Sequence, residues 1–326
     1  MPTRRQAAST ELRLGIRRDQ PRKRLFAVFL CGCLWLAPGF SMAGTIVRVS
    51  TSIGDYSIEL LDEVAPLTVE NFLNYVERNA YNGTYLHRVV DDFVVQGGAY
   101  RFELFVGPVD VPTDPPIPNE FSTSNTLGTV AMAKLEGDPD SATSQWFVNL
   151  TDNTDLDNTN GGFTVFGNVL GEGMAILEGI DELGTRNLGF KAPSAPFFTE
   201  SYRNPLDFVY MNVEQVNRFS SAPHLFESAS GLLITSVDVD NGEERIALNF
   251  SVVPDSEDFI IQANLESVIP RREFDGMATY ASGDTRLRIP TLEVNDQGDV
   301  YLVNNVVFSL VNTNPVQFVL ESYELP

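Results

Sequence analysis

Cysteine and histidine are scarce in this chain of 326 residues, and their scarcity excludes several kinds of chemistry. The only cysteines are Cys31 and Cys33, and the only histidines are His87 and His224. Beyond position 33 the chain can form no disulfide framework, no thiolate metal site and no cysteine nucleophile. A histidine-rich zinc site cannot be built, and a Ser-His-Asp triad would have to use one of the two histidines.

Basic residues are also few, with 22 Lys and Arg against 44 Asp and Glu, which gives a formal net charge of −22. An acidic surface is repelled by nucleic acid and by anionic membranes, so bulk attraction to either is excluded. Beyond the N-terminus no apolar run is long enough to span a bilayer. At 43% hydrophobic and 10% aromatic residues, the composition predicts a folded protein rather than a disordered one.

Residues 1–43 have the order of a secretory signal. Eight basic and two acidic residues precede an apolar stretch over 25–40, and the small residues Ser41 and Ala43 follow. This order predicts cleavage before Gly44, although the basic leader is longer than usual. A membrane anchor and lipoprotein processing at Cys33 are the alternatives. Cleavage would leave 14 basic and 42 acidic residues, and we expect an exported protein, periplasmic or secreted.

The hydrophobic pattern between residues 44 and 216 predicts many short strands and two helices. Residues 107–118 contain five prolines, which predicts a loop. The predicted strands cover 46–60 (as a pair), 85–90, 93–96, 128–133, 145–150, 163–169 and 207–216, and the predicted helices begin at Pro66 and cover 173–183. The fold class indicated is mainly β, a closed β-barrel capped by two helices.

Five motifs in this region occur in the order found in one family. They are Ala65-Pro66-Leu67-Thr68-Val69-Glu70-Asn71-Phe72, Leu86-His87-Arg88-Val89 with Asp92-Phe93-Val94-Val95-Gln96-Gly97-Gly98, Gly128-Thr129-Val130-Ala131-Met132-Ala133, Ser141-Ala142-Thr143-Ser144-Gln145-Trp146-Phe147-Val148 and Phe163-Thr164-Val165-Phe166-Gly167-Asn168-Val169. The chain resembles the cyclophilins, the peptidyl-prolyl cis-trans isomerases, over about residues 45–216. Among these it is most similar to the bacterial periplasmic ones.

The resemblance implies an isomerase that needs no nucleophile, metal or cofactor and acts on proline-containing unfolded or extended polypeptides. Arg88 would be the catalytic guanidinium, although an arginine here could instead pair with Asp91 or Asp92. His87, on the opposite strand face, would be a supporting residue because the reaction moves no proton. The implied substrate-binding residues are Phe93, Val94, Gln96, Met132, Ala133, Lys134, Gln145, Phe147, Leu156 and Phe163.

Three residues depart from the pattern of the family. Asp155 stands where Trp or Phe is common, Phe163 where His or Tyr is common, and Val94 replaces a longer side chain. None of them removes Arg88, so turnover is still expected. The loss of an aromatic residue at Asp155 predicts weak binding of cyclosporin.

The last 103 residues, 224–326, follow a predicted linker at 217–223. His224, at the boundary of this linker, is expected to be exposed. Residues 224–326 contain a tandem repeat with an offset of 55 residues. The recurring residues are Leu232, Ile234, Val239, Asn249, Leu265, Glu266 and Ser267, which return as Leu287, Ile289, Val294, Asn304, Leu320, Glu321 and Ser322. The pattern predicts a small all-β sandwich of two units, without catalytic residues, that is energetically independent of residues 44–218.

The function predicted from the sequence is therefore rotation of X–Pro bonds in exported polypeptides during folding. Two alternatives stay open at this point. One is a module that binds proline peptides without significant turnover. The other is a surface or structural protein in which the repeat matters most. Neither alternative needs a nucleic acid or a stable membrane span.

Overall fold

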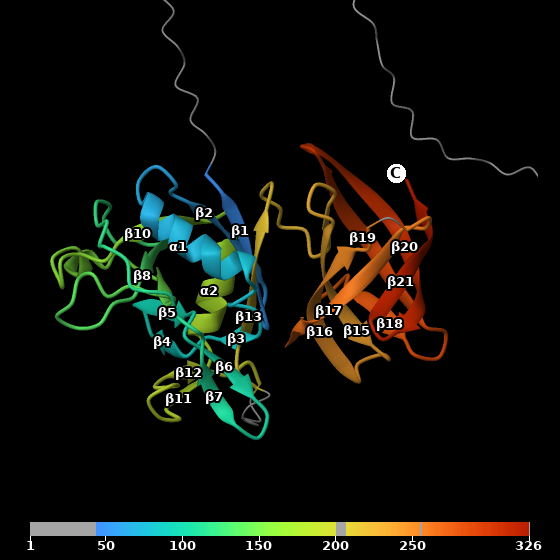
Figure 1. Ribbon diagram of the computed structural model, residues 1–326. Helices are drawn as coiled ribbons and strands as arrows, with labels where there is room; N and C mark the ends of the chain where they lie inside the picture. The colour runs from blue at the N-terminus through green and yellow to red at the C-terminus, as the bar shows by residue number, and fades with distance from the viewer. Residues whose placement is uncertain (1–43, 200–206, 255, 326) are drawn as a thin grey trace, which may run out of the picture. The chain divides into compact units, whose positions relative to one another are not determined.

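The alternating residues between positions 46 and 60 form the predicted pair of strands, which joins a large sheet (Figure 1). The computed structural model describes residues 44–199, 207–254 and 256–325, so the predicted leader lies outside it. Within the described residues, eleven strands pair in the order β4-β5-β9-β8-β10-β2-β1-β13-β3-β6-β7. Their bounds are β1 Ile46–Thr51, β2 Asp55–Leu60, β3 Thr84–Tyr85, β4 Arg88–Val90, β5 Val94–Gly97, β6 Tyr100–Glu103, β7 Gly107–Asp110, β8 Thr129–Met132, β9 Trp146–Asn149, β10 Val165–Leu170 and β13 Tyr210–Val216.

Two helices pack against this sheet, as the sequence predicts (Figure 1). Helix α1 (Pro66–Glu77) begins at a proline, which lacks the N–H that the first turn leaves unpaired anyway. Helix α2 (Gly173–Asp181) buries Leu177 and Ile180. These residues share one hydrophobic core with Phe72 of α1 and with Trp146 of β9. No helix among the described residues is long and apolar enough to cross a membrane.

One edge of this sheet differs from the sequence-based expectation. The five prolines over 107–118 predict a loop, but Gly107–Asp110 is strand β7. This strand lies at one end of the sheet, where Pro108 removes no hydrogen bond that a neighbouring strand would need. No pairing in the described chain joins the end strands β4 and β7, so closure of this sheet into a barrel stays a prediction. A separate pair, β11 (Thr185–Arg186) with β12 (Ala195–Pro196), was not predicted either.

The C-terminal residues form an eight-stranded sheet in which the sequence repeat is visible. Each of the strands β14 to β17 recurs about 55 residues later as one of β18 to β21. Their bounds are β14 Leu225–Glu227, β15 Leu232–Val239, β16 Glu244–Val252, β17 Ile260–Pro270, β18 Ala278–Ala281, β19 Arg286–Asp296, β20 Asp299–Thr313 and β21 Val316–Glu324. The equivalent residues Gln262 and Gln317 face each other across β17 and β21, with a 3.0 Å hydrogen bond between their side-chain amides.

The sequence predicts a sandwich of the two units. In the structure the strands of both units instead pair into one continuous sheet. Each unit's first strand pairs in parallel with the second strand of the other, β14 with β19 and β18 with β15. These pairings join the two ends of the sheet. The repeat pattern reveals the units but not this exchange of strands, because their alternation of apolar residues fits both arrangements.

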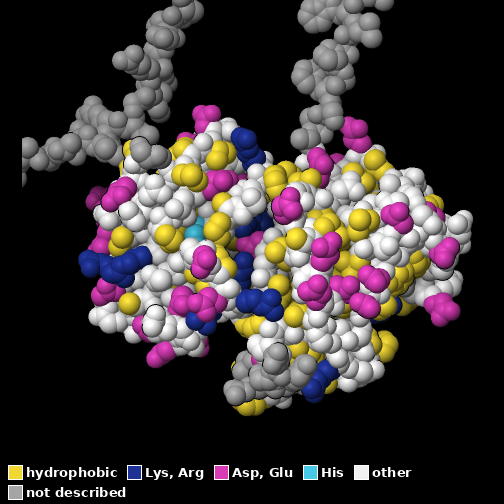
Figure 2. Space-filling view, turned by 180° about the vertical axis from the view of Figure 1, so that it is seen from behind, with side chains coloured by type: hydrophobic (Ala, Val, Ile, Leu, Met, Phe, Trp, Pro, Cys, Tyr) yellow, Lys and Arg dark blue, Asp and Glu magenta, His cyan; other side chains and the backbone are white. Residues whose placement is uncertain are grey.

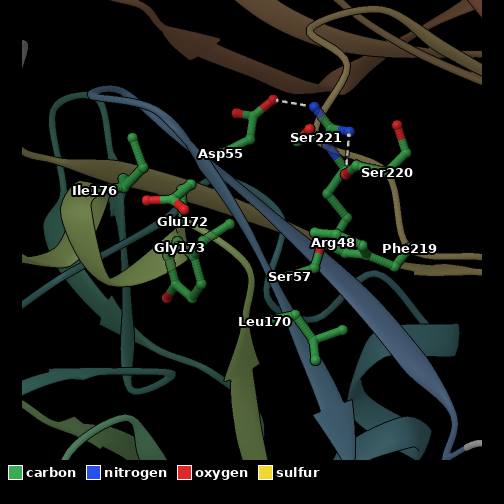
Figure 3. Close-up of a pocket in the computed structure, with 11 residues that line it drawn as sticks. Arg48, Asp55, Ser57, Leu170, Glu172, Gly173, Ile176, Phe219, Ser220 and Ser221 are labelled. Atoms are coloured by element: carbon green, nitrogen blue, oxygen red, sulfur yellow. Dashed lines mark hydrogen bonds and ion pairs between the residues drawn. The ribbon is translucent and has the colours of Figure 1, made fainter.

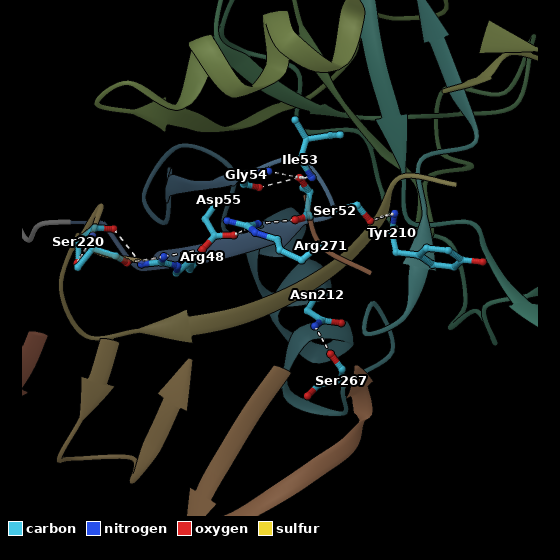
Figure 4. Close-up of polar contacts among 12 residues, drawn as sticks. Arg48, Ser52, Ile53, Gly54, Asp55, Tyr210, Asn212, Ser220, Ser267 and Arg271 are labelled. Atoms are coloured by element: carbon cyan, nitrogen blue, oxygen red, sulfur yellow. Dashed lines mark hydrogen bonds and ion pairs between the residues drawn. The ribbon is translucent and has the colours of Figure 1, made fainter. Parts of the chain in front are cut away.

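A buried cluster of charges links the two sheets (Figure 4). Asp55 of β2 accepts hydrogen bonds from Arg48 of β1 and from Arg271, which follows β17, both at 2.6 Å. The three side chains are only 11%, 2% and 5% exposed. Arg48 also donates to the carbonyl oxygens of Ser220 and Ala222 at 3.3 and 2.6 Å. The predicted linker is therefore held by an arginine of the first sheet.

The electrostatics of this cluster favour its ionised state. Burial alone would raise the pKa of Asp55, but Arg271 and Arg48 lower it below its usual value. A cavity of about 210 Å³ opens beside the cluster. Figure 3 shows the guanidinium of Arg48 between Asp55 and Ser220 at this cavity. Phe219 and Leu170 are among the apolar residues that line the cavity.

Further polar contacts extend the junction along β13. The side-chain amide of Asn212 donates to the carbonyl oxygen of Ser267 at 2.6 Å. The carboxylate of Glu214 accepts from Asn82 and from Asn249, at 2.9 and 2.6 Å, and burial raises its pKa. Partners from both sheets are therefore buried together, although the sequence predicts two energetically independent parts. That independence stays a prediction.

His224 corrects another expectation. It is 1% exposed rather than exposed at the boundary of a linker. Its Nε2 lies 2.8 Å from the carbonyl oxygen of Gly276, so this nitrogen carries the proton, and Nδ1 accepts from the Thr235 hydroxyl at 2.6 Å. Burial lowers the pKa of His224. The neighbouring Pro223 suggested a loop, but the ring has a structural place inside the second sheet.

Candidate active site

Arg88 lies on β4 directly opposite Gln96 of β5, so the two side chains share one face of the sheet. The guanidinium of Arg88 donates from Nη1 to Oε1 of Gln96 at 3.2 Å. Gln96 in turn donates from Nε2 to Oε1 of Gln145 at 3.0 Å. This chain of hydrogen bonds fixes the direction of the arginine. Burial lowers its pKa, but a guanidinium stays protonated at neutral pH.

The alternative partners of Arg88 do not hold it. In the described part of the chain, no ion pair joins Arg88 to Asp91 or Asp92. Its Cζ atom instead lies 5.9 Å from the ring centre of Phe93. The charge of Arg88 is therefore available beside an aromatic surface rather than neutralised by a carboxylate.

A cavity of about 200 Å³ opens next to Arg88, and every residue that lines it was predicted from the sequence. These residues are Arg88, Phe93, Val94, Gln96, Ala133, Lys134, Phe147, Leu156 and Phe163. Phe147 and Phe163 meet edge to face, with ring centres 5.8 Å apart. The cavity thus combines apolar side chains with two cationic ones, Arg88 and Lys134, and it has room for a small ring.

Lys134 helps to shape this cavity. Its Nζ lies 4.9 Å from the ring centre of Phe163 and donates to the carbonyl oxygens of Asn160 and Gly162, at 2.9 and 2.6 Å. Burial lowers its pKa. The ammonium therefore ties the loop before β10 to the segment after β8, and it holds Phe163 in the wall.

A second cavity, of about 340 Å³, adjoins the first and shares Arg88, Gln96, Ala133 and Lys134 with it. Gln145 and His87, also predicted, line this second space. Tyr100 of β6 and Phe190 line it too, and sequence reasoning missed both. Phe190 is 89% exposed in an irregular loop. The loop has no periodic pattern of apolar residues from which a role for Phe190 could be predicted. The one sign of such a role is that its large aromatic ring is exposed.

Two of the predicted site residues, Met132 and His87, are buried. Met132 is fully buried in the main core and does not line either cavity. His87 is 4% exposed and meets the ring of Tyr100 edge to face at 5.1 Å. Burial, with a smaller effect of the Arg88 charge, lowers the pKa of His87 to about 4. The imidazole is therefore neutral at pH 7, which suits a supporting residue.

No group of three or more His, Cys, Asp or Glu side chains that could hold a metal ion occurs among the described residues. The cavity beside Arg88 is lined by aromatic, aliphatic and cationic side chains and by the amide of Gln96, and no carboxylate is among its lining residues. What this arrangement can do chemically is to hold an apolar ring and place a positive charge beside it.

Comparison with known proteins identifies the family. The family model described as cyclophilin type peptidyl-prolyl cis-trans isomerase/CLD matches residues 46–196. A peptidyl-prolyl cis-trans isomerase of Acinetobacter baylyi is 36% identical over 59% of this chain and 96% of its own length. The chain belongs to the cyclophilin family. It is a peptidyl-prolyl cis-trans isomerase.

Two further comparisons concern other cyclophilins. Peptidyl-prolyl cis-trans isomerase B of Escherichia coli is 38% identical over 44% of this chain and 88% of its own length. A crystal structure of a Cryptosporidium parvum cyclophilin covers 54% of this chain and 99% of its own, with 20% identity and a TM-score of 0.41. A second crystal structure of that protein, in the presence of the dipeptide Ala-Pro, has the same TM-score and 19% identity.

The rim of the cyclophilin cavity gives a first prediction. Asp155 is exposed in the short 3₁₀ helix Thr154–Asp157, next to Leu156, which lines the cavity. An aromatic side chain at position 155 would add apolar contact area at this rim. We expect cyclosporin to inhibit Asp155→Trp at about tenfold lower concentration than it inhibits wild type. The reason is that burying an aromatic ring contributes about 1.5–3 kcal/mol to binding. Inhibition curves of isomerase activity measure this, with Asp152→Trp as the matched control, and tight inhibition of the wild type would contradict it.

Proposed function

We propose that this cyclophilin accelerates X–Pro rotation in exported polypeptides while they fold, with Arg88 as the catalytic residue. The observation that carries the proposal is the position of a hydrogen-bonded guanidinium at the edge of a small apolar cavity. Its partners would be proline-containing unfolded or extended polypeptides. The expected place of action is outside the cytoplasm, periplasmic or secreted.

The reaction requires only that a twisted amide be bound more tightly than a planar one. Amide resonance creates a barrier of about 18–20 kcal/mol. As the bond twists, resonance is lost and the prolyl nitrogen gains a lone pair that can accept a hydrogen bond. A guanidinium directed at that nitrogen therefore stabilises the twisted state selectively. A 10⁵-fold acceleration would require about 7 kcal/mol of such stabilisation.

The residues around Arg88 would divide the remaining work. The rings of Phe93, Phe147 and Phe163 would hold the proline ring, because they line the apolar cavity. Gln96 orients Arg88 through its side-chain oxygen, and Gln145 orients Gln96. The backbone at Ala133 and Lys134, at the cavity wall beyond the end of β8, would pair with the extended substrate. No proton transfer enters the mechanism, and the neutral His87 agrees with that.

Export is supported by the order of the first 43 residues, basic, then apolar, then small. We expect a cell that expresses the full chain to export it and to remove the leader before Gly44. N-terminal sequencing of the exported protein gives the cleavage position. As a control, replacing the basic residues of the leader with glutamate should leave the uncleaved chain inside the cell. Recovery of uncleaved wild-type protein in the cytoplasm would contradict the exported role.

A further inference from the structure

A groove lies between the β6–β7 hairpin and β17, away from the proline cavity. Its volume is about 420 Å³, twice that of the cavity beside Arg88 and within the range of about 300–1,000 Å³ that ligand pockets have. Its apolar lining comes from both sheets, with Phe102, Leu104 and Tyr210 from one and Val268 and Pro270 from the other. The groove therefore exists only while the C-terminal sheet is in place.

The hairpin beside the groove ends in three consecutive apolar residues that have almost no cover. Leu104, Phe105 and Val106 are 67%, 104% and 71% exposed. Phe105 has a φ of 66°, a left-handed conformation that is uncommon for a bulky residue. A folded protein rarely leaves a run of three apolar residues in water unless they bind something. Leu104 lines the groove as well, so groove and tip are continuous.

Strand β6 connects this surface to the active site. Tyr100 lines the cavity that contains Arg88 and Gln96, while Phe102 and Leu104, two and four residues later, line the groove. At about 3.3 Å per residue, Tyr100 and Leu104 are about 13 Å apart along the chain. An extended polypeptide needs only about four residues to cover that distance. One substrate chain could therefore occupy both places.

Charge distinguishes a polypeptide from a lipid surface as the occupant. Acidic side chains are spread over the face shown in Figure 2, and the chain has a formal charge of −22. An anionic membrane would be repelled by such a molecule. The groove itself has one arginine, Arg101, and one glutamate, Glu266, so it is close to neutral. Asn79, Asn82 and Gly83 complete the lining beside the apolar residues. A groove without net charge and with apolar walls, in an acidic protein, suits an uncharged segment with apolar side chains.

We propose that the groove and the hairpin tip bind an apolar segment of the same non-native polypeptide whose prolyl bond is turned beside Arg88. This inference rests on the proposed function, since it assumes that unfolded chains are the substrates. Holding the chain at a second place raises the effective concentration of its prolines at the active site. It also gives the C-terminal sheet a function, because β17 supplies one wall.

The test uses residues 44–326, which belong to one compact unit. The probe is a short fluorescein-labelled peptide of alternating leucine and serine, without proline, and its anisotropy reports binding. We expect the double variant L104S/F105S to bind it about tenfold more weakly than wild type, because two apolar side chains lose their contacts. Turnover of a proline tetrapeptide should not change. Refolding of a proline-limited protein should be accelerated less by L104S/F105S than by wild type.

The controls separate this site from the proline site. Leu127→Ser removes another exposed leucine, 55% exposed and outside the groove, and should leave peptide binding unchanged. Arg88→Ala should bind the peptide as wild type does, even if the proposed catalytic role of Arg88 fails. Equal peptide affinity of wild type and L104S/F105S would overturn the proposal. Two other results would also overturn it. If wild type binds lipid vesicles and L104S/F105S does not, the tip belongs to a membrane-binding surface. If wild type sediments as a dimer and L104S/F105S as a monomer, the tip binds a second copy of the chain.

Discussion

Arg88→Ala is expected to lower kcat/KM for a proline tetrapeptide by about 10²–10³-fold, the usual effect of losing one directed donor to a transition state. The physical reason is the position of the guanidinium, held by Gln96 at 3.2 Å beside the apolar cavity. The loss should fall on kcat rather than KM, since the rings that would hold the proline remain. A protease-coupled isomerisation assay on residues 44–326 measures both constants.

Two further variants sharpen this result. Arg88→Lys keeps a positive charge but loses the planar fork of donors, so its rate should lie between those of wild type and Arg88→Ala. Arg78→Ala removes a surface arginine that pairs with Asp114 at 2.7 Å, and it should leave the rate unchanged. Equal rates for wild type and Arg88→Ala would remove the catalytic assignment. They would then favour aromatic desolvation of the prolyl bond as the main source of acceleration.

The residues that line the cavity beside Arg88 were all among those predicted from the sequence, because most of them sit in local motifs. Arg88 and Gln96 are only eight positions apart, joined by one tight turn, so a motif fixes their pairing. Among the apolar residues of the cavity, Val94 and Phe147 lie in strands. The others, Phe93, Ala133, Leu156 and Phe163, lie in turns, in loops or in the 3₁₀ helix, and they were predicted from the resemblance to the family. Phe190 and Tyr100 were missed for the opposite reason. They reach the adjoining cavity from a loop and from a strand that the alternation did not predict.

Contacts between distant residues could not be predicted from local patterns. Arg271 is 216 positions from Asp55, and nothing in either neighbourhood indicates that the two would meet. The same holds for His224, whose partners Thr235 and Gly276 come from different strands and turns. In the repeat, the offset of 55 residues revealed two equivalent units. It could not show that β14 and β18 each pair with a strand of the other unit.

The charge cluster at the junction gives a physical reason to expect that the second sheet contributes to the stability of the first. Asp55 has two arginine partners, and all three side chains are almost completely buried. Because the folded-state pKa of Asp55 is lowered, its contribution to stability is fully present above its usual pKa and is lost as the pH falls through the lowered value. A fragment of residues 44–218 would lack Arg271 and the carbonyl groups that hold Arg48. We therefore expect such a fragment to be less stable than the sequence alone suggested.

Asp55→Ala is expected to lower the free energy of unfolding of residues 44–326 by about 3–5 kcal/mol, since it leaves two buried arginines without their shared carboxylate. The matched control is Asp114→Ala, which breaks a pair that is about 40% exposed and should cost at most about 1 kcal/mol. If Asp55→Ala does not fold, Arg271→Met keeps the Arg48–Asp55 pair and should show a smaller loss at neutral pH. Urea unfolding followed by circular dichroism measures all three. Equal midpoints for Asp55→Ala and Asp114→Ala would show that the junction contributes no more than a surface ion pair, and the two sheets would then be independent after all.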